Sequence, residues 1–121
     1  LELKTYVKPE DLIICADESL FTRVLFNMVK NSMEALLESA DPEIQLSAFQ
    51  SKTGKGNIRI ADNGHGMDKE LTERIFIPFF TTRENGSGIG LSLSRQIINM
   101  HKGSIAVKSA PGKGTEMIVT I

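Results

Sequence analysis

Two asparagines and a glutamate stand at regular spacing in a stretch that otherwise has the pattern of an amphipathic helix. Asn27 and Asn31 lie four residues apart in NMVKNSMEAL, and Glu34 follows three residues later. At about 100° per residue the three side chains share one stripe beside the apolar face. Asparagine is a mediocre helix former, and its side-chain oxygen suits a hard cation such as Mg²⁺. The helix alone leaves two interpretations open, a cation site or a solvated helix edge.

A second group of residues with chemical potential is IADNGHGMD. Asp62 ends an alternating apolar run, and Gly64 and Gly66 follow on either side of His65. Glycines let the backbone turn sharply and let a flat ligand approach. A carboxylate is an acceptor only, so it suits the exocyclic amino group of adenine, whereas guanine places an oxygen there. Taken alone, the segment also fits a glycine-rich turn with a capping aspartate.

A third group, NGSGIGLSLSRQII, places three glycines directly before a helix: Gly86, Gly88 and Gly90. Free backbone N–H groups at a helix start favour phosphate. The common nucleotide fingerprints do not fit, because Leu91 replaces the last glycine of GxGxxG. Neither Gly54-Lys55 nor Gly112-Lys113 is followed by Ser or Thr. The segment therefore predicts neither a Rossmann site nor a P-loop.

The elements that must position these groups follow from periodicity and from turn residues. We predict a short buried strand over 12–15 that contains Cys15, and a helix from the N-cap Asp17 to about Ala40. Further along we predict a hairpin with strands around 44–48 and 58–62, a short helix over 70–75, a long loop, a helix over 89–100, and a closing hairpin over 104–109 and 115–121.

Composition limits the class of protein. With 121 residues and 40% hydrophobic residues, the chain has the size of one domain with one core. The formal net charge of −1 argues against a nucleic-acid partner. A single cysteine makes no internal disulfide and indicates a reducing compartment, and no apolar run approaches the length of a membrane span. We expect a cytoplasmic, soluble domain, and this expectation is compatible with a parent protein that is anchored in a membrane.

Five motifs follow one another in this order: the helix of asparagines, DNGHG, FIPFFTTR, GSGIG and GKGT. With these motifs the chain resembles the ATP-binding domain of sensor histidine kinases. This superfamily is shared with DNA gyrase, the MutL proteins and a class of ATP-driven chaperones. The resemblance covers nearly the whole chain, from ICADESLFTRVL to the last strand. It implies an α/β two-layer sandwich: a mixed, mostly antiparallel sheet of about five strands with three helices on one face. ATP would lie between the helices and a lid.

The resemblance also implies roles for individual residues. Asn31 would be the Mg²⁺ ligand, with Asn27 and Glu34 near the phosphates, and Asp62 would read adenine. Arg83 would reach the terminal phosphate, so the catalytic set is Asn27, Asn31 and Arg83. Phenylalanines would anchor the lid: Phe76, Phe79 and Phe80. The implied nucleotide contacts are Asn31, Glu34, Asp62, Gly64, Gly66, Phe76, Thr82, Arg83, Gly86, Gly88, Ile89, Gly90, Leu91 and Thr115.

The resemblance implies a kinase whose acceptor lies elsewhere. His65 and His101 stand at a turn and at a helix end, so neither has the setting of a phosphate-accepting histidine. We therefore expect residues 1–121 to be a catalytic fragment. With Mg²⁺ and ATP it would phosphorylate a histidine on a helical domain of the same dimeric parent, which in turn serves a response regulator.

The kind of chemistry depends on Asn27. In the gyrase and MutL branches a glutamate at this position activates water, and asparagine cannot accept a proton. This favours phosphoryl transfer to a protein side chain over hydrolysis. Two alternatives stay open: a serine kinase of the anti-sigma-factor type, and a degenerate nucleotide-binding module that signals by conformation. The presence of Asn31, Asp62, Gly88 and Gly90 argues against degeneracy.

Overall fold

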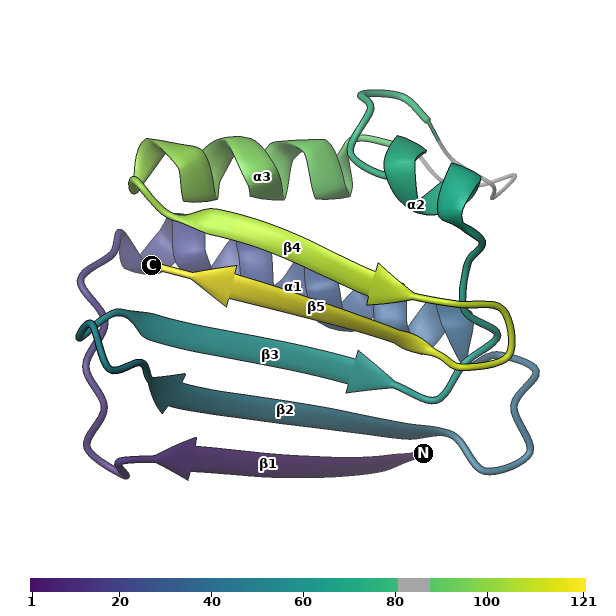
Figure 1. Ribbon diagram of the computed structural model, residues 1–121, viewed down its shortest axis with the longest axis horizontal. Helices are drawn as coiled ribbons and strands as arrows, with labels where there is room; N and C mark the ends of the chain where they lie inside the picture. The colour runs from purple at the N-terminus through teal and green to yellow at the C-terminus, as the bar shows by residue number, and fades with distance from the viewer. Residues whose placement is uncertain (81–87) are drawn as a thin grey trace.

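The computed structural model describes residues 1–80 and 88–121. The described elements, in chain order, are β1 (Glu2–Lys8), α1 (Glu18–Ala35), β2 (Glu43–Gln50), β3 (Gly56–Asp62), α2 (Lys69–Arg74), α3 (Gly90–Met100), β4 (Ser104–Ser109) and β5 (Thr115–Thr120). Figure 1 shows a sheet with α1 running behind it and α3 above β4. None of the described helices is long and apolar enough to cross a membrane.

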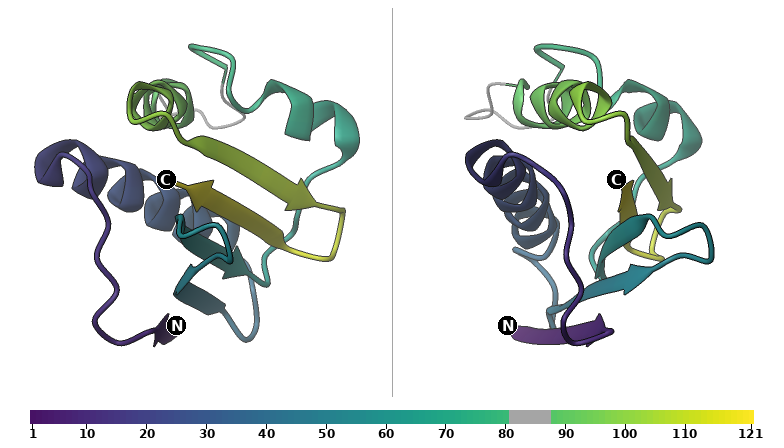
Figure 2. Two further views of the ribbon diagram at one scale, coloured as in Figure 1. Left: turned by 60° about the vertical axis from the view of Figure 1, so that its left-hand side comes forward. Right: turned by 90° about the vertical axis from the view of Figure 1, so that its left-hand side faces the viewer.

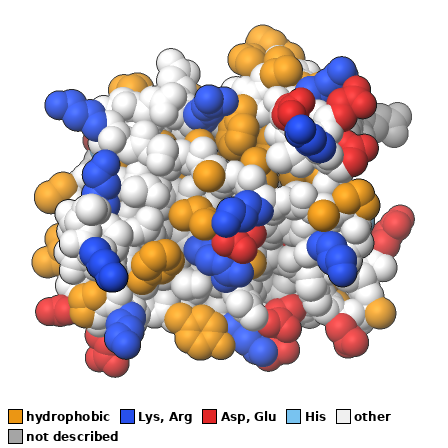
Figure 3. All heavy atoms as spheres, in the orientation of Figure 1, with side chains coloured by type: hydrophobic (Ala, Val, Ile, Leu, Met, Phe, Trp, Pro, Cys, Tyr) orange, Lys and Arg blue, Asp and Glu red, His pale blue; other side chains and the backbone are white. Residues whose placement is uncertain are grey.

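The described strands form one five-stranded sheet in the order β1-β2-β3-β5-β4. β1 pairs with β2 in parallel, and the other neighbouring pairs are antiparallel. The predicted α/β sandwich with a mixed, mostly antiparallel sheet is therefore confirmed. Figure 2 shows α1 and α3 on the same side of the sheet, whereas α2 lies near β4. The opposite face, turned to the viewer in Figure 3, carries a mixture of basic, acidic and apolar side chains.

Alternation along the strands places the core between the sheet and α1 and α3. Every second residue of a strand points to the helices, as the buried Ile58 and Ile60 of β3 do, and the helices contribute buried residues at helical spacing. The buried hydrophobic cluster comprises Val24, Met28, Leu36, Ile44, Ile58, Ile60, Ile97, Ile98, Met117 and Val119.

Helix α1 begins where the sequence predicts. The side chain of Asp17 accepts the N–H of Leu20 at 2.9 Å, which is an N-cap. The helix ends earlier than the predicted Ala40. The N–H of Leu36 bonds to the carbonyl of Met33, and residues 36–38 form a turn that buries the Leu36 side chain. The N–H groups of Leu36 and Leu37 thus bond three residues back instead of four, and the α-helix ends at Ala35.

The predicted strand over 12–15 is wrong. These residues form an extended connector with no place in the sheet, and Cys15 is exposed instead of buried. The side chains alternate, so that Ile14 packs against the core while Ile13 is 85% exposed. The actual first strand, β1, was not predicted, because nearly all of its side chains are exposed and its apolar pattern is weak. Backbone pairing with β2 decides its structure.

Candidate functional site

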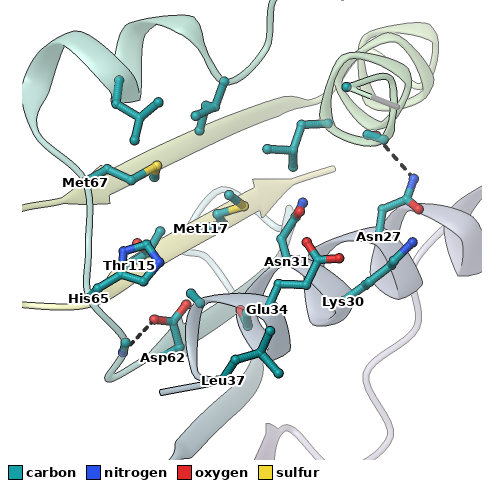
Figure 4. Close-up of a pocket in the computed structure, with 18 of the residues that line it drawn as sticks. Asn27, Lys30, Asn31, Glu34, Leu37, Asp62, His65, Met67, Thr115 and Met117 are labelled. Atoms are coloured by element: carbon teal, nitrogen blue, oxygen red, sulfur yellow. Dashed lines mark hydrogen bonds between the residues drawn. The ribbon is translucent and has the colours of Figure 1, made fainter. Parts of the chain in front are cut away.

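A cleft of about 1090 Å³ opens between α1, the end of β3, the start of β5 and the start of α3. Its described polar lining residues come from distant parts of the chain, and Figure 4 shows how several of them converge. They include Arg23, Asn27, Lys30, Asn31, Ser32, Glu34, Asp62, Asn63, His65 and Thr115. Apolar side chains such as Leu71, Leu93 and Met117 form much of the remaining wall. A cleft with this mixture can hold a ligand that is flat and apolar at one end and charged at the other.

Asp62 forms one end of the cleft. It continues the inward-facing series of Ile58 and Ile60, and its Oδ1 atom accepts the N–H of Gly64 at 2.9 Å. Burial raises the pKa of this carboxyl, while hydrogen bonds from the Gly64 amide and the Ser32 side chain act in the opposite direction. A partly buried acceptor of this kind favours a ligand that brings an N–H donor.

Close packing of the backbone explains why glycines follow Asp62, whereas the sequence had indicated room for a flat ligand. A Cβ on Gly64 would lie 2.6 Å from the carbonyl oxygen of Ala35, at the end of α1. Gly66 has φ +71°, and its Cβ would collide with the carbonyl oxygen of Ala110. Protein backbone, not ligand, therefore excludes side chains at both positions. Gly64 lines the cleft, whereas Gly66 is not among its described lining residues.

The end of β4 and the turn between β4 and β5 are hydrogen-bonded to residues 65–67, which follow Asp62. The hydroxyl of Ser109 accepts the N–H of Met67 at 2.8 Å and lies 2.8 Å from the Thr115 hydroxyl. The N–H of Gly112 donates to the carbonyl of His65 at 2.8 Å. The sequence predicted Thr115 at the site but not Ser109. A serine at the end of a strand carries no periodic signal that could have found it.

The helix stripe faces the cleft, as its spacing predicted. Asn27, Asn31 and Glu34 all line it, and Figure 4 shows them in a row along α1. Asn27 is also bound to α3: its Nδ2 atom donates to the carbonyl of Gly90 and to the hydroxyl of Ser94, each at 3.2 Å. Asn27 therefore joins the two long helices at the mouth of the cleft.

The donor set on α1 fits a cation that takes most of its ligands from elsewhere. Asn31 and Glu34 offer side-chain oxygens, which Mg²⁺ prefers. No cluster of three or more His, Cys, Asp or Glu side chains able to hold a metal occurs within residues 1–80 and 88–121. Such a pair suits Mg²⁺ that keeps water and phosphate ligands.

The segment between α2 and α3 is described only at its two ends. The N–H of Phe79 donates to the carbonyl of Gly88 at 2.8 Å, which brings these ends together. Three of the predicted site residues lie outside the described residues: Thr82, Arg83 and Gly86. Gly88, Ile89, Gly90 and Leu91 line the cleft, as does Phe80.

Phe76 packs against α3 and does not line the cleft. Its ring lies beneath the guanidinium of Arg95, with Cζ 5.3 Å from the ring centroid, and it is not among the described residues that line the cleft. The aromatic ring instead attaches the segment after α2 to the outer side of α3 through a cation–π contact. Its contact with a nucleotide stays a prediction.

Comparison with known proteins places this chain in one class. A family model described as "Histidine kinase-, DNA gyrase B-, and HSP90-like ATPase" matches residues 16–121. The chain belongs to this family of ATP-binding domains. The nucleotide-free catalytic domain of the histidine kinase ThkA is 33% identical, with a TM-score of 0.86 over 99% of this chain and 77% of that one.

The curated relatives are sensor kinases. The histidine-protein kinase AtoS of Escherichia coli strain K12 is 45% identical over 101 residues, which cover 84% of this chain and 16% of AtoS. Sporulation kinase D of Bacillus subtilis strain 168 is 33% identical over 116 residues, which cover 96% of this chain and 22% of that protein. The chain thus corresponds to the ATP-binding catalytic part of much longer proteins and spans less than a quarter of these two relatives.

Proposed function

We propose that residues 1–121 form the catalytic domain of a sensor histidine kinase that binds Mg²⁺-ATP. The domain transfers the γ-phosphoryl group to a histidine on a separate helical domain of the same dimeric parent, and a response regulator receives the group afterwards. The observation that carries this proposal is one cleft that is lined both by Asp62 and by the stripe of Asn27, Asn31 and Glu34 on α1. A kinase of this kind draws on cellular ATP, so we assign the domain to the cytoplasm.

The Asp62 end suits the base. The carboxylate accepts from the adenine amino group, and the hydroxyls of Ser32 and Thr115 line the same part of the cleft. Met117 offers an apolar surface beside them. A guanine at this position presents a carbonyl oxygen to the carboxylate, which leaves two acceptors opposed. The domain therefore selects adenine nucleotides.

The α1 stripe and the start of α3 suit the triphosphate. Asn31 would hold Mg²⁺, which neutralises charge on the phosphates when bound, and Asn27 and Glu34 would lie beside it near the phosphates. Lys30 and Arg23 line the same end and add positive charge. Residues 88–91 line the cleft, and α3 begins among them at Gly90. N–H groups at the start of a helix favour anions.

The side chains in the described cleft favour a phosphoryl acceptor that comes from another domain. Asn27 cannot take a proton from water, and its NH₂ group is bound to α3. Both nitrogens of His101 are in use, because Nε2 accepts the N–H of Asp17 and Nδ1 donates to the carbonyl of Ile97. His65 donates through Nδ1 to the carbonyl of Gly66. His65 lies beside Asp62 and Thr115, at the part of the cleft that we assign to the base and not to the phosphates (Figure 4). We infer that the phosphate-accepting histidine arrives on another domain, with its own nucleophilic nitrogen.

The test is a transfer assay with γ-labelled ATP. The domain alone should label itself negligibly and hydrolyse ATP slowly, because general-base assistance worth roughly 10²–10⁴ in rate is missing. The parent's histidine-bearing helical domain, added separately, should become labelled. The label should be acid-labile and alkali-stable, as a phosphoramidate is. An acid-stable label would indicate a serine kinase and contradict the proposal, and so would rapid hydrolysis by the domain alone.

A matched pair of variants tests the metal end. Asn31→Asp should reduce labelling by disturbing the ligand set at the phosphates. Asn99→Asp is the control, because Asn99 is exposed on α3 and does not line the cleft. Equal labelling by both variants would remove Asn31 from the metal site.

A further inference from the structure

The contact between α1 and α3 contains a buried hydroxyl that has no role in the function proposed above. Ser94 is fully buried in α3, with 0% exposure. Its Oγ donates to the carbonyl of Gly90 at 2.8 Å and accepts from Nδ2 of Asn27 at 3.2 Å. The Asn27 amide also donates to the Gly90 carbonyl at 3.2 Å. Three polar groups from two helices thus form one closed arrangement.

This arrangement permits only one orientation of the Asn27 amide. The Gly90 carbonyl accepts and never donates, and the proton of Ser94 is already directed at that carbonyl. A flipped Asn27 would place its oxygen against the Gly90 carbonyl, which can only accept, and would draw the Ser94 proton away from that carbonyl. Figure 4 shows the Asn27 nitrogen turned to α3 and the oxygen turned away from it. Within the described residues no donor is bound to that oxygen, and Asn27 lines the cleft.

We propose that Ser94 is a positioning residue that makes Asn27 an acceptor at the phosphate end of the cleft. Asn27 then receives hydrogen bonds from the water molecules that accompany a Mg²⁺-nucleotide, and it does not donate to phosphate oxygens. This inference rests on the proposed ATP-binding function and deepens it. It also explains why an asparagine, which carries both a donor and an acceptor, serves here: the amide donor joins the helices while the oxygen serves the ligand.

The experiment compares Ser94→Ala with Ser92→Ala. Ser92 lies on the same helix and its hydroxyl donates to the carbonyl of Ile89 at 3.1 Å, away from Asn27. In the nucleotide-free protein, the side-chain amide NMR signals of Asn27 should shift in Ser94→Ala and stay in place in Ser92→Ala. Unchanged Asn27 signals in Ser94→Ala would overturn the proposal. Should Ser94→Ala fail to fold, Ser94→Cys, with its weak sulfur acceptor, takes its place.

Nucleotide affinity provides the second measurement. In Ser94→Ala, the gain in ATP affinity on adding Mg²⁺ should fall about three- to tenfold, the value of one hydrogen bond. Affinity for ATP without Mg²⁺ should stay the same. In an Asn27→Ala background, Ser94→Ala should have no further effect, because a residue that acts through Asn27 has nothing left to position. A full additional loss in that background, or an equal loss in Ser92→Ala, would overturn the proposal.

Failure of the proposed ATP binding and failure of the Ser94 role give different results. A wild-type domain that binds no ATP overturns the proposed function and, with it, the role of Asn27 toward the nucleotide. A wild-type domain that binds Mg²⁺-ATP while Ser94→Ala retains the full Mg²⁺ effect overturns only the role of Ser94.

Discussion

Asp62 and Gly64 form a closed local unit, in which the carboxylate that faces the cleft accepts the N–H of a residue two positions later at 2.9 Å. One oxygen of the carboxylate is thereby held by its own turn. Gly64 in turn packs so closely on the Ala35 carbonyl that no side chain fits. The end of α1 and the end of β3 are therefore fixed relative to each other through the residue proposed to read the base.

The first prediction is that Asp62→Asn separates stability from binding. Burial raises the pKa of Asp62, so folding stabilises the neutral carboxyl relative to the carboxylate when compared with the unfolded chain. Its stabilising contribution is complete below the unfolded pKa and is lost as the pH rises through the folded pKa. The amide, always neutral, should make the nucleotide-free domain more stable than the wild type at neutral pH, and the difference should vanish in acid. Thermal unfolding across pH measures this, with Asp11→Asn, an exposed position, as control.

The second prediction concerns the base. The wild type should bind ATP and ADP in preference to GTP, and Asp62→Asn should bind ATP more weakly. The introduced NH₂ group can face the adenine amino group, and a buried donor without a partner costs roughly 1–3 kcal/mol. Calorimetry on both proteins with both nucleotides measures the difference. Equal affinity of the wild type for ATP and GTP would show that Asp62 does not read the base.

The third prediction compares two glycines with the same backbone conformation. Gly66 and Gly112 have φ +71° and +73°, so alanine is strained equally at both. Only at Gly66 does a Cβ meet backbone, at Ala110, while Gly112 has open space around it. Gly66→Ala should therefore lower the free energy of unfolding by roughly 1–3 kcal/mol more than Gly112→Ala. Chemical denaturation measures both, and equal losses would contradict this account of the turn.

The fourth prediction concerns His101, which joins the end of α3 to the start of α1. Its ring accepts the Asp17 N–H at 3.0 Å and donates to the Ile97 carbonyl at 2.8 Å. His101→Ala should lower the melting temperature, because it removes both bonds, whereas Met100→Ala, at a neighbouring position that is 67% exposed, should change it little. A His101→Ala variant as stable as the wild type would show that this contact adds nothing to the fold.

Several features could be predicted from the sequence because they depend on local patterns. Alternation places Ile58 and Ile60 in a strand that delivers Asp62 to its end, and Asp17 is a recognisable N-cap. Helical spacing alone puts Asn27, Asn31 and Glu34 on one stripe, and the cleft lies along that stripe. These predictions succeed because period and capping act within a few residues of the chain.

Other features were decided only by tertiary structure, since they depend on residues far apart in the chain. The run over 12–15 is as apolar as a buried strand but finds no partner, while the exposed β1 is a strand because β2 pairs with it. Gly66 is a glycine because Ala110 lies against it, and Ser94 acquires a role because α3 crosses α1 at Asn27. The sequence by itself determined which residues can do chemistry and on which element each stands. Packing of distant backbone decided which of their atoms face the cleft, because a hydrogen bond or a collision between two segments exists only once the chain has folded.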